Sequence, residues 1–491
     1  MFISILQKSG AAGTFCLLLG LGIIPGLISC RTGSGTMPAE RPVPAEQAPG
    51  NAAVPQDRPG PAGTADILAE VADRLGEEKF EEALALFETI NPEDAATDRI
   101  RLLKASVLVS ADRIEEARSI VAALLEKEPD NADALYVLSA IELASGKDRE
   151  QRLMLERIIK DDPKNAAALT GLGNIALRAR SFKTAAGYFD RVLAEDAQNP
   201  DALIGRAEIY RVNRDYKQAE TLLNKAISLY PNNSAARHER GRLYRAAGHP
   251  ALGLADVETA EKLDPGNYWI LCDKGNILLG MGRRKEALAA FEKAKTLDPG
   301  EFLAYVYAGG IKDETGDYEG AERDYAMIVK LRPDYYFAAE GLGILKMRKK
   351  EWNEARDAFL FAYKQAPAEY YYALLAAVCW MRGGKPADPR QFLTQALGKV
   401  QRDSPEWYLV RLYYDLSGRV FAGETDMIIR AEREKNPNMK FRAFFYLANY
   451  YDIRGMGSTA EKYYLMAKDM DQQALPEWRL NAWALEARNL D

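Results

Sequence analysis

Histidine and cysteine are scarce in this chain of 491 residues. Its two histidines are His238 and His249, and beyond residue 30 its cysteines are Cys272 and Cys379. Neither histidine has a second histidine or a cysteine at the spacing of a metal site, so the sequence predicts no metal centre and no catalytic triad built on histidine. We find no other arrangement of acids, nucleophiles or glycines that predicts catalysis, and we expect neither an enzyme nor a bound cofactor.

A surplus of positive charge is also absent. The formal net charge is −6, with 65 Lys and Arg against 71 Asp and Glu. Proteins that bind nucleic acid generally carry a basic stripe or an excess of basic residues. We therefore expect no nucleic-acid partner.

The chain begins with an apolar run, from Phe15 to Ile28, that is short for a membrane-spanning helix. At its end, Leu27-Ile28-Ser29-Cys30 resembles the lipobox of bacterial lipoproteins. The resemblance implies that residues 1–29 are a signal peptide and that Cys30 carries diacylglyceryl and further acyl chains, such as palmitate, which together anchor the protein. An uncleaved signal anchor is the alternative. By analogy with a known sorting rule, Arg31 favours an outer-membrane lipoprotein that faces the periplasm, with the cell surface as the second location.

Residues 30–63 contain seven prolines mixed with glycine, alanine and scattered charges, without an apolar period. Such a composition is typical of a tether that spaces a folded domain from its anchor. A proline-rich ligand for a partner is the other interpretation.

A repeat dominates the rest of the sequence. The tetrapeptide Leu-Asp-Pro-Gly occurs at Leu263 and again 34 residues later at Leu297. A period of that length is typical of stacked helix pairs. The unit between the two copies has Gly275 on its first expected helix and Phe291 on its second, and Gly282 separates the two helices.

Prolines recur in phase with this period, and so does a trio of small and aromatic residues in the second helix. The prolines in phase are Pro129, Pro163, Pro231, Pro265, Pro299, Pro333 and Pro367. The pattern resembles the tetratricopeptide repeat. The resemblance implies an all-α, helix-turn-helix solenoid in a right-handed superhelix, with about twelve helix pairs over residues 64–474 and a C-terminal capping helix over residues 475–491.

Small residues have a defined place in this packing. The second glycines of Gly171-Leu172-Gly173 and Gly341-Leu342-Gly343 are expected where two helices approach closely, because neither sequence has the third glycine or the preceding strand of a phosphate-binding loop.

Cys272 and Cys379 fall on first helices three repeats apart, too far for a disulfide. We expect both to be buried thiols.

Partner-binding residues follow from the family resemblance, because first helices of such repeats line a concave groove. The positions that face the groove predict a cationic patch followed by an apolar, aromatic one. The predicted partner-binding residues are Asn174, Arg178, Arg211, His238, Arg242, Arg245, Trp269, Phe337, Met347, Tyr371 and Leu374. This combination suits a partner peptide or helix that is acidic and has apolar anchors. Alternatively, nearby acids satisfy the arginines, and the superhelix, a second copy or a tyrosine-rich segment buries the apolar set.

The sequence thus predicts a membrane-anchored scaffold or adaptor of the cell envelope that binds a protein in its groove. The alternative is a component that binds a small ligand or glycan for envelope transport or the cell wall, with Trp269, Phe337 and Tyr371 stacking on the ligand. That alternative requires a closed aromatic pocket with converging polar groups.

Overall fold

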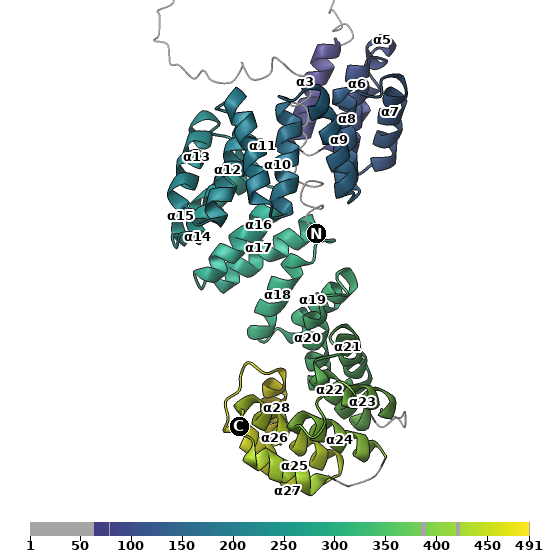
Figure 1. The fold of residues 1–491 in the computed structure, drawn as a ribbon, viewed down its shortest axis with the longest axis vertical. Coiled ribbons are helices and arrows are strands. Elements are labelled where there is room, and N and C mark those ends of the chain that lie inside the picture. The colour runs from purple at the N-terminus through teal and green to yellow at the C-terminus, as the bar shows by residue number, and fades with distance from the viewer. Residues whose placement is uncertain (1–62, 78, 384–388, 419–422, 491) are drawn as a thin grey trace, which may run out of the picture. The chain divides into compact units, whose positions relative to one another are not determined.

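The computed structural model describes residues 63–77, 79–383, 389–418 and 423–490 (Figure 1). The predicted lipidated Cys30, the signal peptide and the tether lie outside these residues. Every regular element in the described part is an α-helix, and the helices follow one another in antiparallel pairs. The predicted all-α helix-turn-helix solenoid is therefore confirmed. No helix in this part of the chain combines the length and the apolar composition that crossing a membrane requires.

The chain divides into two compact units, an N-terminal unit (Met1–Asp298) and a C-terminal unit (Pro299–Asp491), and each is described by itself. The helices of the N-terminal unit are α3 (Thr64–Gly76), α4 (Phe80–Phe87), α5 (Pro92–Ala95), α6 (Asp98–Ser110), α7 (Ile114–Lys127), α8 (Ala132–Ala144), α9 (Asp148–Asp161), α10 (Ala166–Arg178), α11 (Phe182–Glu195), α12 (Pro200–Val212), α13 (Tyr216–Leu229), α14 (Ser234–Ala246), α15 (Pro250–Leu263), α16 (Tyr268–Gly280) and α17 (Arg284–Leu297).

The C-terminal unit continues the same alternation of first and second helices. Its helices are α18 (Leu303–Glu314), α19 (Tyr318–Leu331), α20 (Tyr336–Arg348), α21 (Trp352–Gln365), α22 (Tyr370–Arg382), α23 (Arg390–Leu397), α24 (Pro405–Ser417), α25 (Glu424–Arg433), α26 (Pro437–Ile453), α27 (Gly457–Lys468) and α28 (Pro476–Glu486). Taken over both units, the described helices form twelve pairs, the number expected from the sequence. The short α5 lies between two of the pairs, and α28 follows the last one.

Asparagines define where the first helices of the N-terminal unit begin. Helices α8, α10, α12, α14 and α16 each start after an asparagine whose side chain accepts a hydrogen bond from a backbone N–H of the first turn. Such a cap satisfies a donor that the helix itself leaves unpaired, and is worth about 1 kcal/mol relative to alanine. The caps recur with the repeat and fix its register.

Glycine and phenylalanine explain how tightly neighbouring helices approach. The ring of Phe189 on α11 lies between Gly173 of α10 and Gly205 of α12, and a Cβ built at either glycine would come within 2.7 Å of that ring. Gly275 and Phe291 repeat the arrangement between α16 and α17. The expectation that Gly173 serves helix packing is thus confirmed, and Phe189 is fully buried.

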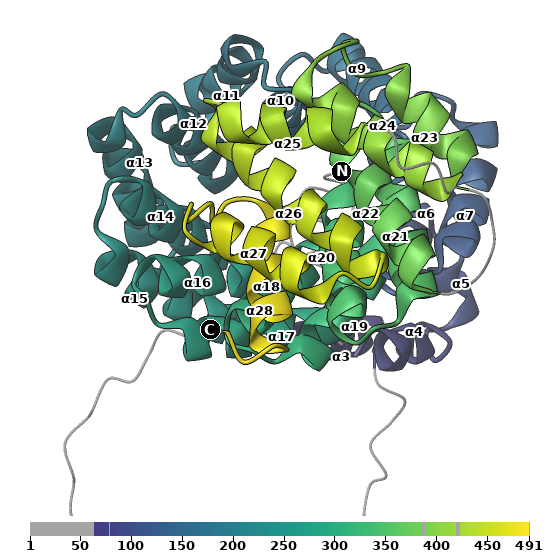
Figure 2. The same ribbon diagram turned by 90° about the horizontal axis from the view of Figure 1, so that it is seen from below.

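The core of the C-terminal unit is large and rich in tyrosine, and α26 lies at its centre. Helix α26 packs on α22 and α24, and the terminal helix α28 packs on α27 and also on α20, more than a hundred residues earlier in the chain (Figure 2). Arg479 of α28 donates two hydrogen bonds, of 2.6 and 2.8 Å, to the carboxylate of Asp313. Each of the two cysteines in the described part of the chain, Cys272 and Cys379, is buried as a free thiol, as expected.

Candidate partner-binding face

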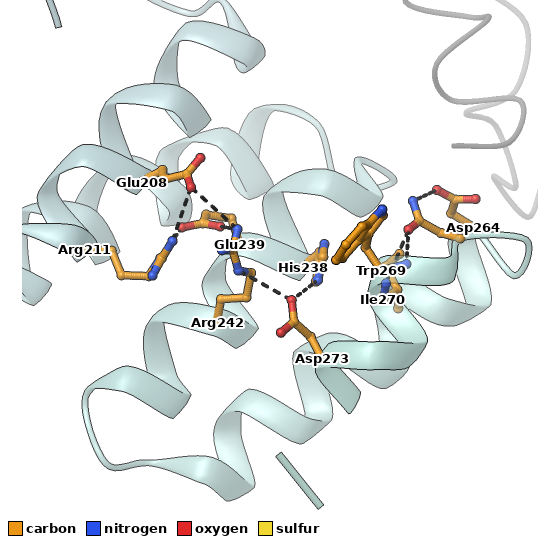
Figure 3. Close-up of polar contacts among 10 residues, drawn as sticks. Glu208, Arg211, His238, Glu239, Arg242, Asp264, Trp269, Ile270 and Asp273 are labelled. Carbon is orange, nitrogen blue, oxygen red and sulfur yellow. Dashed lines mark hydrogen bonds and ion pairs between the residues drawn. The ribbon is translucent and has the colours of Figure 1, made fainter. Parts of the chain in front are cut away.

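Three of the side chains predicted to bind a partner in the N-terminal unit, Arg211, His238 and Arg242, belong to a network of opposite charges that spans three first helices. We define the charge network as Glu208 and Arg211 from α12, His238, Glu239 and Arg242 from α14, and Asp273 from α16 (Figure 3). Within α12 and α14, each arginine follows a glutamate by three residues, a spacing that places both on one helix face. The repeat then brings these faces side by side.

Glu239 is the centre of the network. Its carboxylate accepts a 2.5 Å hydrogen bond from Nε of Arg211 and a 2.8 Å bond from Nη1 of Arg242. The Glu239 side chain is only 5% exposed, and that of Arg211 is 13% exposed. A carboxylate removed this far from water requires such partners, so the two arginines stabilise Glu239 and are held in place by it.

Asp273 extends the network to α16. Its Oδ2 atom lies 2.9 Å from Nε2 of His238 and 3.4 Å from Nε of Arg242. Burial by itself would raise the pKa of Asp273, but the hydrogen bond from His238 and the nearby positive charges lower that pKa to about 2. Asp273 is therefore ionised at neutral pH.

The charges of the network also shift the pKa values of Arg242 and Glu208. The pKa of Arg242 is raised, chiefly by the charge of Glu239 and against the effect of burial. Burial and the neighbouring charge of Glu239 raise the pKa of Glu208, which lies 3.4 Å from Arg211. Three carboxylates thus balance the cations here, and the prediction of a net cationic patch is wrong for Arg211, His238 and Arg242.

Four further predicted residues of the N-terminal unit lie outside the charge network. Arg178, on α10, binds Gln151 at 2.8 Å and Asp148 at 3.2 Å, so it too is paired. Asn174 and Arg245 are exposed, and Trp269 is half-buried at the start of α16, with its ring edge-on to Tyr268 at 5.1 Å. The charge of Arg245 helps to lower the pKa of Asp273. We call the charge network together with Asn174, Arg245 and Trp269 the network face.

The sequence contained a signal for some of the missed acids. Glu208 is the ninth residue of its repeat, the position that gave Asn174 and Arg242 in neighbouring repeats. Glu239 and Asp273 stand one residue after the fifth position, directly beside His238 and Cys272. In this family the groove-facing positions are the second, fifth, ninth and twelfth of each repeat. Because a helix face is broader than a single position, a prediction based on these four omits their neighbours.

The predicted apolar residues lie in the C-terminal unit, where most are part of the core. Leu374 is fully buried, and Met347 and Tyr371 are each 8% exposed. The backbone carbonyl of Tyr371 accepts a hydrogen bond from Tyr446 of α26, and its hydroxyl donates to Glu340. These three are therefore corrected from partner-binding to core residues, because α26 and the rest of the unit cover them. Phe337 remains 54% exposed.

The burial of Tyr371 also argues against the aromatic pocket that a small ligand or glycan would need. Its ring packs on Tyr372 at 4.3 Å and lies under the guanidinium of Arg442 at 4.3 Å, which leaves no free face for a ligand. A surface pocket of about 450 Å³ lies elsewhere, at α24 and α25, and none of the predicted site residues lines it. Within the described part of the chain, no group of three or more His, Cys, Asp or Glu side chains is placed to hold a metal ion.

Known proteins match this chain through its repeats. Sequence models of the tetratricopeptide repeat match residues 74–141, 176–243 and 272–336, so the chain contains tetratricopeptide repeats. The RNA polymerase-associated protein CTR9 of Caenorhabditis elegans is 27% identical over 135 residues, which make up 26% of this chain and 12% of that protein. The chain thus spans a small part of the curated relative that it matches.

Solved structures with similar folds are also repeat proteins. A tetratricopeptide repeat protein from Parabacteroides merdae is 20% identical, covers 51% of this chain and 98% of its own, and superposes with a TM-score of 0.39. YrrB, described as a TPR protein with an unusual peptide-binding site, is 22% identical, covers 38% of this chain and 95% of its own, and has a TM-score of 0.28. At these identities the likeness describes the repeat fold alone.

Proposed function

We propose that this protein is an adaptor without bond-making chemistry, and that it binds a protein partner along the network face of its N-terminal unit. Repeats of this family serve protein–protein interaction, which supports the class of function. The observation that carries the proposal is the rigid charge network that spans α12, α14 and α16 and leaves Arg245, Asn174 and Trp269 outside it.

Because two arginines of the charge network are already paired with an acid of the same network, this face suits a different partner from the acidic one expected from the sequence. Arg211 and Arg242 are already bound to Glu239, so they position the face and are not the main attraction for an acidic ligand. Arg245 is exposed and acts on Asp273 only through its charge, so it can bind a carboxylate of the partner. Trp269 offers an apolar surface, and the amide of Asn174 can bond a peptide backbone. We therefore propose a peptide or helix with one acidic residue near an apolar anchor, rather than a strongly acidic segment.

Location is the second part of the proposal. The lipobox-like sequence before Cys30 supports a lipid anchor, the proline-rich residues 31–63 support a tether, and Arg31 supports the outer membrane facing the periplasm. Anchoring would restrict the adaptor to the envelope and raise the effective concentration of a membrane-bound partner.

The test is a quantitative pull-down from detergent-solubilised membranes with the full chain as bait. The first variant combines Arg245→Glu with Trp269→Ala, and the control is Lys217→Glu, an exposed position on the second helix α13. We expect one protein to be retained by the wild type and the control but reduced about tenfold or more by the double variant. Equal recovery by all three baits would rule out the network face as the binding site.

The anchor is tested separately by Cys30→Ser. We expect this variant to lose acyl labelling and to leave the membrane fraction, while its network face stays intact. Retention of the unlabelled variant in the membrane would instead favour an uncleaved signal anchor.

A further inference from the structure

Two first helices of the C-terminal unit, α18 and α20, begin after an aromatic residue, whereas α24 and α26 begin after a serine and an asparagine that cap them. The residues that precede α18 and α20 are Phe302 and Tyr335, and neither helix has a side-chain cap. In the N-terminal unit, the residue that precedes each of α14 and α16 is an asparagine that caps its helix; Tyr335 stands at the same place in the 34-residue repeat, whereas Phe302 stands one residue after it. Because an asparagine there is worth about 1 kcal/mol, helix stability does not explain the aromatic choice.

These residues form a connected row of rings, which we call the aromatic edge: Phe302, Tyr335, Tyr336 and Phe337. Tyr335 lies 5.8 Å from Phe302 and 5.9 Å from Phe337, and Tyr336 stacks on Phe337 at 4.3 Å with the planes 30° apart. The neighbours fix the ring of Phe337, yet 54% of this residue is exposed. A rigid, solvent-exposed aromatic ring is typical of a binding surface.

Negative charge surrounds the aromatic edge. The turns directly before α18, α20 and α22 contain four carboxylates, those of the buried Asp298 and of Glu301, Asp334 and Glu369, against the single guanidinium of Arg332. Arg332 is already engaged, since it binds Asp334 at 2.6 Å and lies over the ring of Phe302. The edge therefore favours a ligand that combines flat apolar groups with positive charge.

Two proline-rich sequences of this chain each offer an arginine side chain, which stands next to an acid, so that neither sequence carries a net charge. Residues 38–44 read Pro-Ala-Glu-Arg-Pro-Val-Pro and residues 55–61 read Pro-Gln-Asp-Arg-Pro-Gly-Pro, so both follow the pattern Pro-x-acid-Arg-Pro-x-Pro. Both copies lie outside the described residues. A polyproline II helix has three residues per turn, and a peptide of this pattern bound in that form would present proline, arginine and proline along one edge. Aromatic surfaces recognise such helices because their conformation costs little entropy to fix.

We propose that the aromatic edge binds the Pro-x-acid-Arg-Pro-x-Pro motif of a second copy of this protein. Proline rings pack on Phe337 and its neighbours, and the motif's arginine pairs with the carboxylates of Glu301 or Glu369. Each chain carries two copies of the motif, 17 residues apart, so one proline-rich segment can serve two receptor chains or rebind to one. This contact would link adaptors to one another, independently of the partner bound to the network face.

The test uses a fluorescent peptide of residues 37–62 and, as receptor, the full chain with Arg41→Glu and Arg58→Glu, so that its own motifs do not compete. We expect saturable binding by fluorescence anisotropy. Adding Phe337→Ala to the receptor should weaken binding about tenfold, and so should the two Arg→Glu changes in the peptide. The matched control is Leu252→Ala, since Leu252 is also 54% exposed but lies in the N-terminal unit; it should leave binding unchanged.

Absence of saturable binding to the parent receptor, or equal binding by the Phe337→Ala receptor, would overturn the proposal and assign Phe337 to another ligand. Sedimentation equilibrium tests the second-copy assignment. The apparent mass of the wild-type chain should rise with concentration more than that of the Arg41→Glu, Arg58→Glu chain, and identical curves would contradict the assignment.

Discussion

The imidazole of His238 lies 2.9 Å from the carboxylate of Asp273, a residue of the next first helix, α16. This contact joins two consecutive repeats through side chains that are 16% and 18% exposed. The pKa of Asp273 is lowered to about 2, so its carboxylate keeps its charge except in strong acid.

We predict that Asp273→Asn lowers the stability of the protein at pH 7 by about 2 kcal/mol, because a carboxyl whose pKa is depressed on folding stabilises the folded state when ionised. This stabilisation is present above the unfolded pKa of roughly 4 and is lost as the pH falls toward 2. Urea denaturation of both proteins should therefore show a clear difference in midpoint at pH 7 that becomes small near pH 2. A difference that stays constant with pH would show that the carboxylate charge is not responsible.

Glu239 provides a second prediction. Glu239→Gln removes the charge that holds Arg211 and Arg242 and leaves both guanidiniums without their main partner. Breaking a buried pair in this way costs about 3 kcal/mol. The matched control is Glu115→Gln, whose side chain is 87% exposed and should change stability by less than about 0.5 kcal/mol. Similar thermal midpoints for the two variants would mean that the network is not structural.

Helix packing at Phe189 predicts opposite effects for two Gly→Ala substitutions. At Gly205, the new methyl group would lie 2.4 Å from the ring of Phe189, and we expect a loss of about 1–3 kcal/mol. At Gly187, within α11, no atom lies within 4 Å of the added carbon, and we expect a gain of up to about 1 kcal/mol from helix propensity. Denaturant titration of both variants measures these changes, and a neutral Gly205→Ala would contradict the packing described here.

The sequence predicted the repeat well because the repeat is a local pattern. Gly173 and Phe189 recur with the period, and their contact needs only adjacent helices, so small and aromatic residues at fixed spacing were enough to predict it. The prediction failed where long-range packing decides exposure. Leu374 and Tyr371 occupy groove-facing positions, but α26, more than fifty residues later, covers them.

Three predicted residues lie on the expected helices, but the acids that pair with them were not predicted. Arg211, His238 and Arg242 do lie together on first helices, whereas their partners Glu239 and Asp273 stand one residue away from the positions used. A repeat pattern specifies which helix face a residue is on, but the pairing of its charges depends on rotamers and on the neighbouring repeat.

The last helix offers a prediction about local order. Arg479→Ala removes the two hydrogen bonds to Asp313 and the cation–π contact with Trp483. We expect amide hydrogen exchange to become faster in α28 and in the part of α18 around Asp313, with helices of the N-terminal unit unchanged. Arg283→Ala, which breaks an exposed pair with Glu286, is the control and should have no such effect. Unchanged exchange in α28 would show that its other contacts suffice.

The most direct test of the central claim is site-specific photo-crosslinking in intact cells. A photoreactive amino acid replaces Asn174 on the network face in one chain and Lys217 on α13 in another, both exposed positions of the N-terminal unit. If the network face binds a protein, the probe at Asn174 yields a discrete adduct of higher mass and the probe at Lys217 does not. A discrete adduct at Lys217 alone, or the same adducts at both positions, would contradict the assignment of the partner to this face.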